Sequence, residues 1–410
     1  AAGRLTTSAF ADEEVTYEHP SDINSVVDIM KNYAFIGFNE VDMNGHQHIN
    51  LLVNKVVGLP GDMGIRKNYA GVYEYYVNKL PENISGELKI GENDPCVSNL
   101  TIGSDYTIST NGSERYIEPN HVKVSPSVTN IKAETATNKY IDLVNLQNSF
   151  ISYSAMLAEN ADSTEGIGFN GQYDSSSNTW QNINRINVTA ESGTVFYNID
   201  DTNFSKINSD AIINFSDTST ASIVLNIDLK NISWDRKPFR LNIGGNQPTM
   251  NEDVILEDNV NRIYYNFYDS SAADKMTTKT VSMTDAAHGT IIIPKGAAKV
   301  GSNWCGVIVA NNIGATGESH FVGAYNPVVP ASATVDVTVN KVWSEPSGQF
   351  HDSYYVKVDL MRSSAAETAQ AIDTATLDAS NNFEYTFTGL KEKDADGNTY
   401  TYTVANEITD

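Results

Sequence analysis

The sequence is poor in cysteine: its 410 residues include two, Cys96 and Cys305. No CxxC pair is present, which excludes a zinc ribbon and a thioredoxin-like redox centre. One disulfide between the two cysteines and two independent buried thiols both stay open, because the sequence gives no distance between them.

Long apolar runs and positive charge are also scarce. No apolar segment approaches the roughly 20 residues of a membrane-spanning helix, so we expect no membrane span in this chain. Lysine and arginine number 27 against 51 aspartates and glutamates, giving a formal net charge of −24. A chain this acidic repels phosphate backbones and anionic lipids, which argues against nucleic acid as a partner.

Catalytic and metal-binding signatures are missing as well. The sequence contains no GxSxG elbow, no HExxH pair, no Walker loop and no D-x-D-x-D-G calcium loop. His46 and His48 share one face if they lie on a strand, but a metal site needs a third ligand and none is close in sequence. We interpret them as polar turn residues, and Glu318 with His320 in "GESHF" as a structural element. We expect no metal, no cofactor and no catalytic residue.

The composition present is that of a folded, strand-rich chain. Hydrophobic residues make up 40% and charged residues 19%, with 21 tyrosines and 14 phenylalanines, and such a length favours two or three domains. A short helix is predicted within residues 22–32, and a long one within 139–160. In the long helix an apolar stripe steps by three and four residues, as expected for a helix packed on a larger body. The stripe comprises Leu143, Leu146, Phe150, Tyr153 and Leu157.

Two features suggest how the chain is divided. Ala9-Phe10-Ala11, followed by three acidic residues, matches a signal-peptidase site, so we interpret residues 1–11 as the remnant of a signal peptide and expect export. Pro327 and Pro330 indicate a stiff linker. We therefore expect one domain over 12–328, a linker over 329–334 and a second domain over 335–410.

The second domain opens with "VDVTVNKVW", which alternates like a strand with one buried face. Val335, Val337 and Val339 share that face, and Lys341 and Trp343 follow on it. An ammonium among apolar side chains is desolvated, which favours the neutral, nucleophilic amine. The alternative interpretation is a lysine that extends from a strand end into water.

From about residue 20 to 328 the order of motifs resembles the choice-of-anchor A domain of bacterial surface adhesins. The resemblance implies a secreted, wall-associated adhesin that binds a host extracellular matrix protein or glycan. It also implies a β-solenoid of the ice-binding-like type with a helix lying along it. The segments concerned are "YAFIGFNEVDMNGHQHINLLVNKVVG", "YIDLVNLQNSFISYSAMLAE", "TVFYNID", "ASIVLNIDLKNISW", "RIYYNFYDS", "GTIIIPKGAAKV" and "CGVIVANNIGATGESHF".

Residues 334–410 resemble a collagen-adhesin B-type (Cna-B) repeat, on "VTVNKVW", "YYVKVDLMR" and "LDASNNFEYTFTGL" followed by "DADGNTYTYTV". The resemblance implies a small β-sandwich stalk unit of Gram-positive adhesins and pili. The predicted fold class is therefore all-β dominated, with an N-terminal β-solenoid, one long packed α-helix and a C-terminal β-sandwich.

The Cna-B resemblance also implies an intramolecular isopeptide bond. In the family a lysine of the first strand bonds to an asparagine of the last, assisted by a buried acid, and this makes Lys341 the expected amine. For the acid, Glu407 would need a β-bulge to face inward, and Asn406 is the alternative inward residue. The partner asparagine is expected beyond Asp410, on a last strand that this domain would lack, so we expect Lys341 to be unreacted here.

The predicted function is a non-enzymatic cell-surface adhesin or pilus-type subunit, attached to the bacterial cell wall. Enzymatic chemistry would be limited to autocatalytic formation of the isopeptide bond. The alternative is a secreted carbohydrate-active β-solenoid enzyme on a Cna-B stalk. Release of oligosaccharides by the N-terminal domain would distinguish the two hypotheses.

Overall fold

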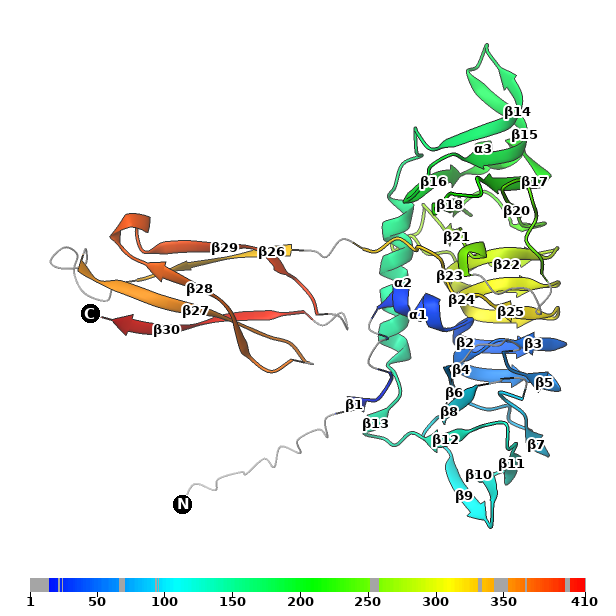
Figure 1. The fold of residues 1–410 in the computed structure, drawn as a ribbon, viewed down its shortest axis with the longest axis horizontal. Helices are drawn as coiled ribbons and strands as arrows, with labels where there is room; N and C mark the ends of the chain where they lie inside the picture. Colours follow the sequence, from blue (N-terminus) through cyan, green and yellow to red (C-terminus); the bar gives the residue numbers. More distant parts are fainter. Residues whose placement is uncertain are drawn as a thin grey trace, which may run out of the picture. The chain divides into compact units, whose positions relative to one another are not determined.

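The structure is a computed structural model. It describes residues 15–20, 23, 25–65, 71–92, 94, 96–250, 258–330, 334–342, 353–365, 367–394 and 399–409, with side chains to 405. The chain divides into two compact units, residues 1–328 and 329–410. Both are built mainly of strands, as the sequence predicts (Figure 1).

The first unit contains three α-helices among its described residues: α1 (Val26–Asn32), α2 (Leu143–Ala158) and α3 (Asp201–Lys206). Both predicted helices are thereby confirmed. The strands up to α2 are β1 (Thr16–Tyr17), β2 (Phe35–Met43), β3 (His46–His48), β4 (Leu51–Gly58), β5 (Asp62–Met63), β6 (Val72–Lys79), β7 (Glu87–Leu88), β8 (Val97–Ile102), β9 (Thr107–Asn111), β10 (Glu114–Glu118), β11 (Val122–Val124), β12 (Asn130–Ala133) and β13 (Asn138–Lys139). After α2 come β14 (Ile167–Asp174), β15 (Thr179–Val188), β16 (Thr194–Ile199), β17 (Ile207–Phe215), β18 (Ser222–Asp228), β19 (Asp235–Arg236), β20 (Arg240–Ile243), the 3-10 turn η1 (Asp258–Val260), β21 (Ile263–Tyr268), β22 (Thr280–Met283), β23 (Ala287–Val300), β24 (Trp304–Ala315) and β25 (Ser319–Phe321).

A large parallel sheet dominates this unit, in the order β12-β8-β6-β4-β2-β24-β23-β21-β18-β16. Its strands stack in register; Val224 of β18, for example, lies between Phe196 of β16 and Tyr264 of β21. Strands β18 and β21 are nearly continuous apolar runs, as expected when both faces of a parallel sheet are covered. The sheet is not closed, because β12 and β16 form its two edges.

The middle of this sheet joins segments from opposite ends of the unit. β2 pairs in parallel with β24, so Phe35 lies beside Ile308 and Met43 beside Ala315. On the β2 side of this pair, the strand order follows the chain forward, from β2 through β4, β6 and β8 to β12. On the β24 side, it follows the chain backward, from β24 through β23, β21 and β18 to β16. The first and last thirds of the unit therefore meet at its centre.

Strands β23 and β24 are long and bent, and each pairs with different neighbours along its length. In β23, Thr290–Ile292 pair with β21, and after a register shift Ala297–Val300 pair with β22. In β24, Trp304–Gly306 pair with β25, whereas the rest pairs with β2. β25 in turn pairs in parallel with β3, and β3 with β5.

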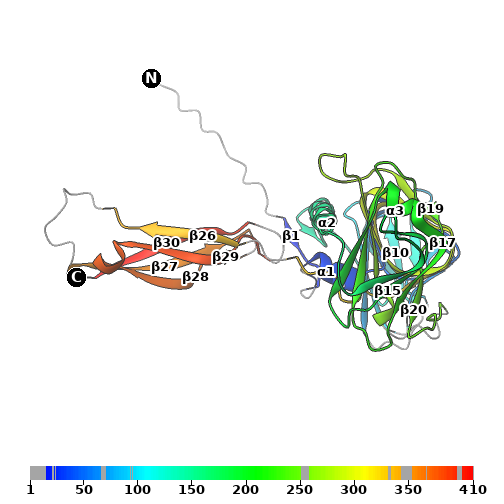
Figure 2. The ribbon, with the colours of Figure 1, turned by 90° about the horizontal axis from the view of Figure 1, so that it is seen from above.

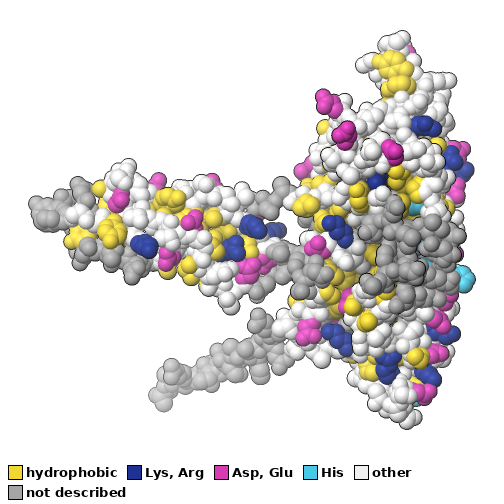
Figure 3. Space-filling view, viewed as in Figure 1, with side chains coloured by type: hydrophobic (Ala, Val, Ile, Leu, Met, Phe, Trp, Pro, Cys, Tyr) yellow, Lys and Arg dark blue, Asp and Glu magenta, His cyan; other side chains and the backbone are white. Residues whose placement is uncertain are grey.

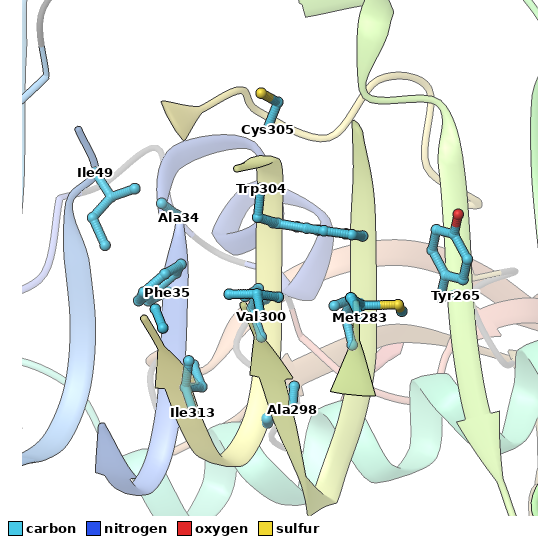
Figure 4. Close-up of a cluster of buried hydrophobic side chains, with 14 of the residues drawn as sticks. Ala34, Phe35, Ile49, Tyr265, Met283, Ala298, Val300, Trp304, Cys305 and Ile313 are labelled. Carbon is cyan, nitrogen blue, oxygen red and sulfur yellow. The ribbon is translucent and has the colours of Figure 1, made fainter. Parts of the chain in front are cut away.

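Buried side chains fill the interior between these strands. Trp304 lies edge-on to Tyr265, with ring centroids 6.0 Å apart, and Met283 and Val300 lie beside it (Figure 4). The indole N–H of Trp234 contacts the sulfur of Met283 at 3.3 Å. This aromatic-rich interior, rather than any disulfide, holds the unit together.

Helix α2 lies on the outer face of the parallel sheet (Figures 1 and 2). It contacts β2, β23, β21 and β18, so it crosses the stack of strands. Sixteen helical residues extend about 24 Å, enough to cover the roughly 19 Å from β2 to β18. The Asp142 side chain caps the helix by accepting from the N–H of Asn145 at 2.9 Å. The predicted stripe is confirmed, with Leu146, Phe150, Tyr153 and Leu157 buried and Leu143 partly buried.

Smaller sheets flank the large one. They are the parallel pair β1-β13, the four-stranded β7-β11-β10-β9 and the four-stranded β14-β15-β17-β20. In the last of these, β15, β17 and β20 are parallel, whereas β14 forms an antiparallel hairpin with β15. The chain therefore alternates between two sheets as it passes from β15 to β18.

The second unit consists of two antiparallel sheets on a common core. β26 (Thr334–Asn340) pairs with β29 (Glu384–Lys391). β27 (Tyr355–Ser363) lies between β28 (Gln370–Leu377) and β30 (Thr401–Thr409), and a 3-10 turn, η3 (Ala379–Asn381), precedes β29. The core comprises Val356, Val358, Leu360, Ala375, Leu377 and Phe387.

Candidate functional site

Lys341 follows the first strand of the second unit. In β26, half-buried Val335, Val337 and Val339 alternate with exposed residues, which confirms the predicted buried face. Lys341 lies one residue beyond the strand, and its backbone N–H donates to the Phe383 carbonyl at 2.9 Å. Its side chain is half-buried, and Nζ donates to the Val342 carbonyl at 3.2 Å. Trp343, the other expected neighbour, lies outside the described residues.

Asn406 and Glu407 both lie on β30. The strand pairs with β27 without any shift of register, placing Asn406 opposite Val358 and Glu407 opposite Lys357. The side chain of Val358 is buried and that of Lys357 is exposed. The side chains of Asn406 and Glu407 themselves lie outside the described part of the chain. Their roles as inward residue and assisting acid therefore stay predictions.

The two cysteines, both within the described residues, are thiols and do not form a disulfide. Cys305 is buried in β24, and half-buried Cys96 directly precedes β8. Three strands separate β8 from β24, which corresponds to about 19 Å at the usual strand spacing. A disulfide needs Cα atoms within about 7 Å, so the sheet order keeps the cysteines apart.

The structure brings the two histidine motifs together. β3 and β25 are adjacent and parallel, and His48 pairs with His320 in register. Their rings stack with centroids 5.1 Å apart, and Glu318 Oε1 lies 3.2 Å from Nε2 of each. His46, on the same strand, instead contacts Asp62 Oδ1 through Nδ1 at 2.7 Å. Sequence reasoning missed this convergence because the third group is distant in sequence.

A second feature that sequence reasoning missed is an aromatic hairpin. β14 and β15 extend from a Ser-rich turn between Asp174 and Thr179 and form a hairpin. Tyr173 pairs with Trp180 across the hairpin, with ring centroids 5.2 Å apart, and Phe169 lies 6.4 Å from Trp180. Tyr173 is 51% exposed. Hydrophobic side chains gather at this end of the unit (Figure 3).

Polar side chains line the turn of this hairpin. Ser176 and Ser177 hydroxyls donate to the Asp174 carboxylate at 2.6 and 2.7 Å, and these bonds lower the pKa of Asp174 to about 2. The Asp174 carboxylate is therefore ionised at neutral pH. The Asn182 amide donates to Gln172 Oε1 at 2.8 Å. The hairpin thus presents its aromatic rings on one face, where the Tyr173 hydroxyl donates to Asn178 Oδ1, whereas Asp174 and Gln172 project towards the opposite face.

Comparison with known protein families now assigns both units. Residues 27–321 match the putative ice-binding-like adhesive domain. The chain belongs to this family. Residues 337–410 match the Cna protein B-type domain. The predicted order, an adhesive domain followed by a Cna-B domain, is confirmed. No curated protein and no solved structure matches the chain.

These matches make the chain an adhesin-type surface protein with an extracellular or surface location. The adhesive domain implies binding to an external ligand, and neither family is enzymatic. Within the residues that the structure describes, every helix is too short or too polar to cross a membrane.

Proposed function

We propose that the protein is a cell-surface adhesin of a Gram-positive bacterium. Its adhesive domain binds a host glycan or extracellular matrix protein, and its Cna-B domain is part of a stalk or pilus attached to the cell wall. The observation that supports this proposal best is the succession of the two matched domains in one chain. The strongly negative net charge agrees with a soluble surface protein.

The adhesive domain is, in this proposal, a β-solenoid. Each turn of the chain adds one strand to the parallel stack. Val195 of β16, Ile223 of β18 and Ile263 of β21, for example, lie side by side on successive strands. Alternation between β15, β17, β20 and β16, β18, β21 corresponds to successive turns of such a coil. Helix α2 then lies along the coil axis, because it crosses the stacked strands.

The β14–β15 hairpin is the surface on which we propose that the ligand binds. A pyranose ring presents an apolar C–H face and a rim of hydroxyl groups. Exposed Tyr173 and half-buried Trp180 can pack against the C–H face, and the side-chain amide of Asn178, whose Oδ1 accepts from the Tyr173 hydroxyl, can form hydrogen bonds with the sugar hydroxyls. This pairing of rings with amides favours a glycan over a protein as ligand.

Binding of the purified protein to glycan arrays and to immobilised matrix proteins tests this function. We expect a glycan ligand. Tyr173→Ala should bind this glycan about tenfold more weakly, because it removes an exposed aromatic ring from the β14–β15 hairpin. Tyr385→Ala is the matched control: Tyr385 is 42% exposed and has an aromatic neighbour, Phe387, at 4.9 Å, but lies in the Cna-B domain.

Three outcomes would contradict parts of the proposal. Equal binding by Tyr173→Ala and wild type would exclude the hairpin as the binding surface. Binding to matrix proteins alone would replace the glycan. Release of oligosaccharides from a bound polymer would favour the alternative function, a secreted carbohydrate-active enzyme.

We further propose that Lys341 forms an isopeptide bond in the full-length protein. Its place directly after β26, beside half-buried Val339, supports this role. Amide formation with an asparagine releases ammonia, so the intact mass should be about 17 Da below the sequence mass. Lys341→Arg should restore the full mass, and exposed Lys357→Arg should leave the deficit unchanged. A full mass in folded wild-type protein that includes the partner asparagine would refute the cross-link.

A further inference from the structure

Two buried histidines meet at the junction of β3 and β25. His320 pairs with His48 in the parallel register, so their side chains project from the same side of adjacent strands. Their rings are stacked at 5.1 Å with an angle of 20° between planes, and both side chains are 3% exposed. Burial of two imidazoles side by side is unusual for turn residues, which would normally reach water.

A carboxylate lies between the two imidazoles. Glu318 directly precedes β25, and its Oε1 lies 3.2 Å from His48 Nε2 and 3.2 Å from His320 Nε2. All three ligand atoms lie within 4.8 Å of one another. In the part of the chain that the structure describes, no other trio of His, Cys, Asp or Glu side chains converges in this way.

These separations match the edges of a coordination polyhedron. Ligand bonds of about 2.0–2.2 Å at tetrahedral angles place neighbouring donor atoms about 3.3–3.6 Å apart. The two N–O separations of 3.2 Å are close to that range. Small rotations of the side chains would therefore be enough to admit a metal ion.

We propose that His48, Glu318 and His320 bind one divalent transition-metal ion such as Zn²⁺. Two imidazoles and one carboxylate suit Zn²⁺ and its neighbours in the periodic table, whereas Ca²⁺ and Mg²⁺ prefer an all-oxygen ligand set. The Glu318 side chain is 33% exposed, so the site opens to solvent on the carboxylate side. An ion can enter there, and a water molecule can complete the coordination.

The surrounding backbone holds the three ligands in place. The backbone N–H of Trp304 donates to the Glu318 carbonyl at 3.1 Å, which fixes the backbone of Glu318 against β24. Buried Gln47, next to His48, donates from Nε2 to the Gly317 carbonyl at 2.7 Å. β3 and the segment before β25 are therefore joined independently of the metal, as expected for a preformed site. A bound ion would add a second connection between these two strands.

Isothermal titration with Zn²⁺ tests the proposal, on chelator-treated full-length protein without a histidine tag. We expect one Zn²⁺ per chain and a higher melting temperature with Zn²⁺, because the ion binds the folded state. His320→Gln and Glu318→Gln should each weaken binding at least about 100-fold, since each removes a ligand. His121→Gln is the matched control, because exposed His121 contacts a carboxylate, Glu118, at 2.9 Å in another sheet.

Circular dichroism and melting of the metal-free variants establish that they are folded. If His320→Gln does not fold, Glu318→Gln decides, because Glu318 is partly exposed. The proposal is wrong if folded wild-type protein binds no Zn²⁺ or if Glu318→Gln binds it as tightly as wild type. Loss of binding in His121→Gln would also overturn it, because the ion would then bind elsewhere.

Discussion

The hydroxyl of Ser154 in α2 donates a hydrogen bond to Oδ1 of Asn266 in β21, 2.6 Å away, and both residues are fully buried. The Asn266 amide donates back to the Ser154 carbonyl at 3.0 Å and to Asn226 Oδ1 at 2.9 Å. Asn226 in turn donates to the Leu157 carbonyl at 2.7 Å. Polar contacts therefore fix the position of α2 on the sheet, whereas apolar packing alone would tolerate sliding.

Asn266→Ala should lower the free energy of unfolding by about 2–4 kcal/mol, because it leaves buried partners without their hydrogen bonds. Urea denaturation of the full chain measures this difference. Asn130→Ala is the control: Asn130 also donates to an asparagine, Asn99, at 2.8 Å, but it is exposed, and we expect a change within about 0.5 kcal/mol. An equal loss in free energy of unfolding in the two variants would contradict a special role for the buried hydrogen bonds of Asn266.

Gly306 of β24 cannot accept a side chain. It lies opposite Gly289 of β23 with a φ of +156°, and a Cβ built on it would lie 1.8 Å from the Gly289 carbonyl oxygen. Gly306→Ala should therefore destabilise the protein by about 3 kcal/mol or more. Gly314→Ala, on the same strand, should change stability by less than about 1 kcal/mol, because the nearest atom would be Lys299 Cγ at 3.6 Å. Thermal melting of both variants checks the contrast.

His288 should make stability depend on pH. It is fully buried in β23, its Nε2–H donates to the Thr249 carbonyl at 3.1 Å, and burial lowers its pKa from 6.5 to about 4. The unfolded chain binds this proton more readily, so stability is full above pH 6.5 and is lost as the pH falls towards 4. Between pH 7 and 4, wild type should lose about 3 kcal/mol more than His288→Gln. Parallel pH profiles of the two proteins would refute this prediction.

Phe387 should affect the second unit alone. It is 2% exposed in a core separate from that of the first unit. Phe387→Ala should cost about 3–5 kcal/mol and lower the melting temperature of the Cna-B domain only. Differential scanning calorimetry of Phe387→Ala should show a lower melting temperature for one transition and an unchanged one for the other. Tyr385→Ala should change neither melting temperature by much. Equal displacement of both transitions would mean that the two units unfold together.

Local patterns in the sequence were enough to predict several elements. The three-and-four spacing of Leu146, Phe150 and Tyr153 predicted α2 and its buried face. The alternation of Val335, Val337 and Val339 predicted β26 and its inward side. The order of motifs predicted both families. These predictions rest on the spacing of residues within one element, or on the order of short motifs along the chain.

The histidine site could not be predicted in this way, because it depends on pairing between distant strands. His48 and His320 meet only because β3 and β25 are adjacent, and no period in the sequence encodes that pairing. The hairpin was missed for another reason. β14 is interrupted by a register shift between Asn170 and Gln172, and Gly171 weakens its alternating pattern.

The pairing of β2 with β24 has a consequence for how this protein is made. β2 and β24 cannot pair until the segment around Ile308 has been synthesised, which is more than two hundred residues after Phe35. Closing so long a loop is slow, and most contacts of the domain are non-local. The emerging chain should therefore lack its completed central sheet for most of its synthesis. A narrow export channel admits a chain whose fold is incomplete, so this topology suits a protein that completes its structure only after it has left the cell.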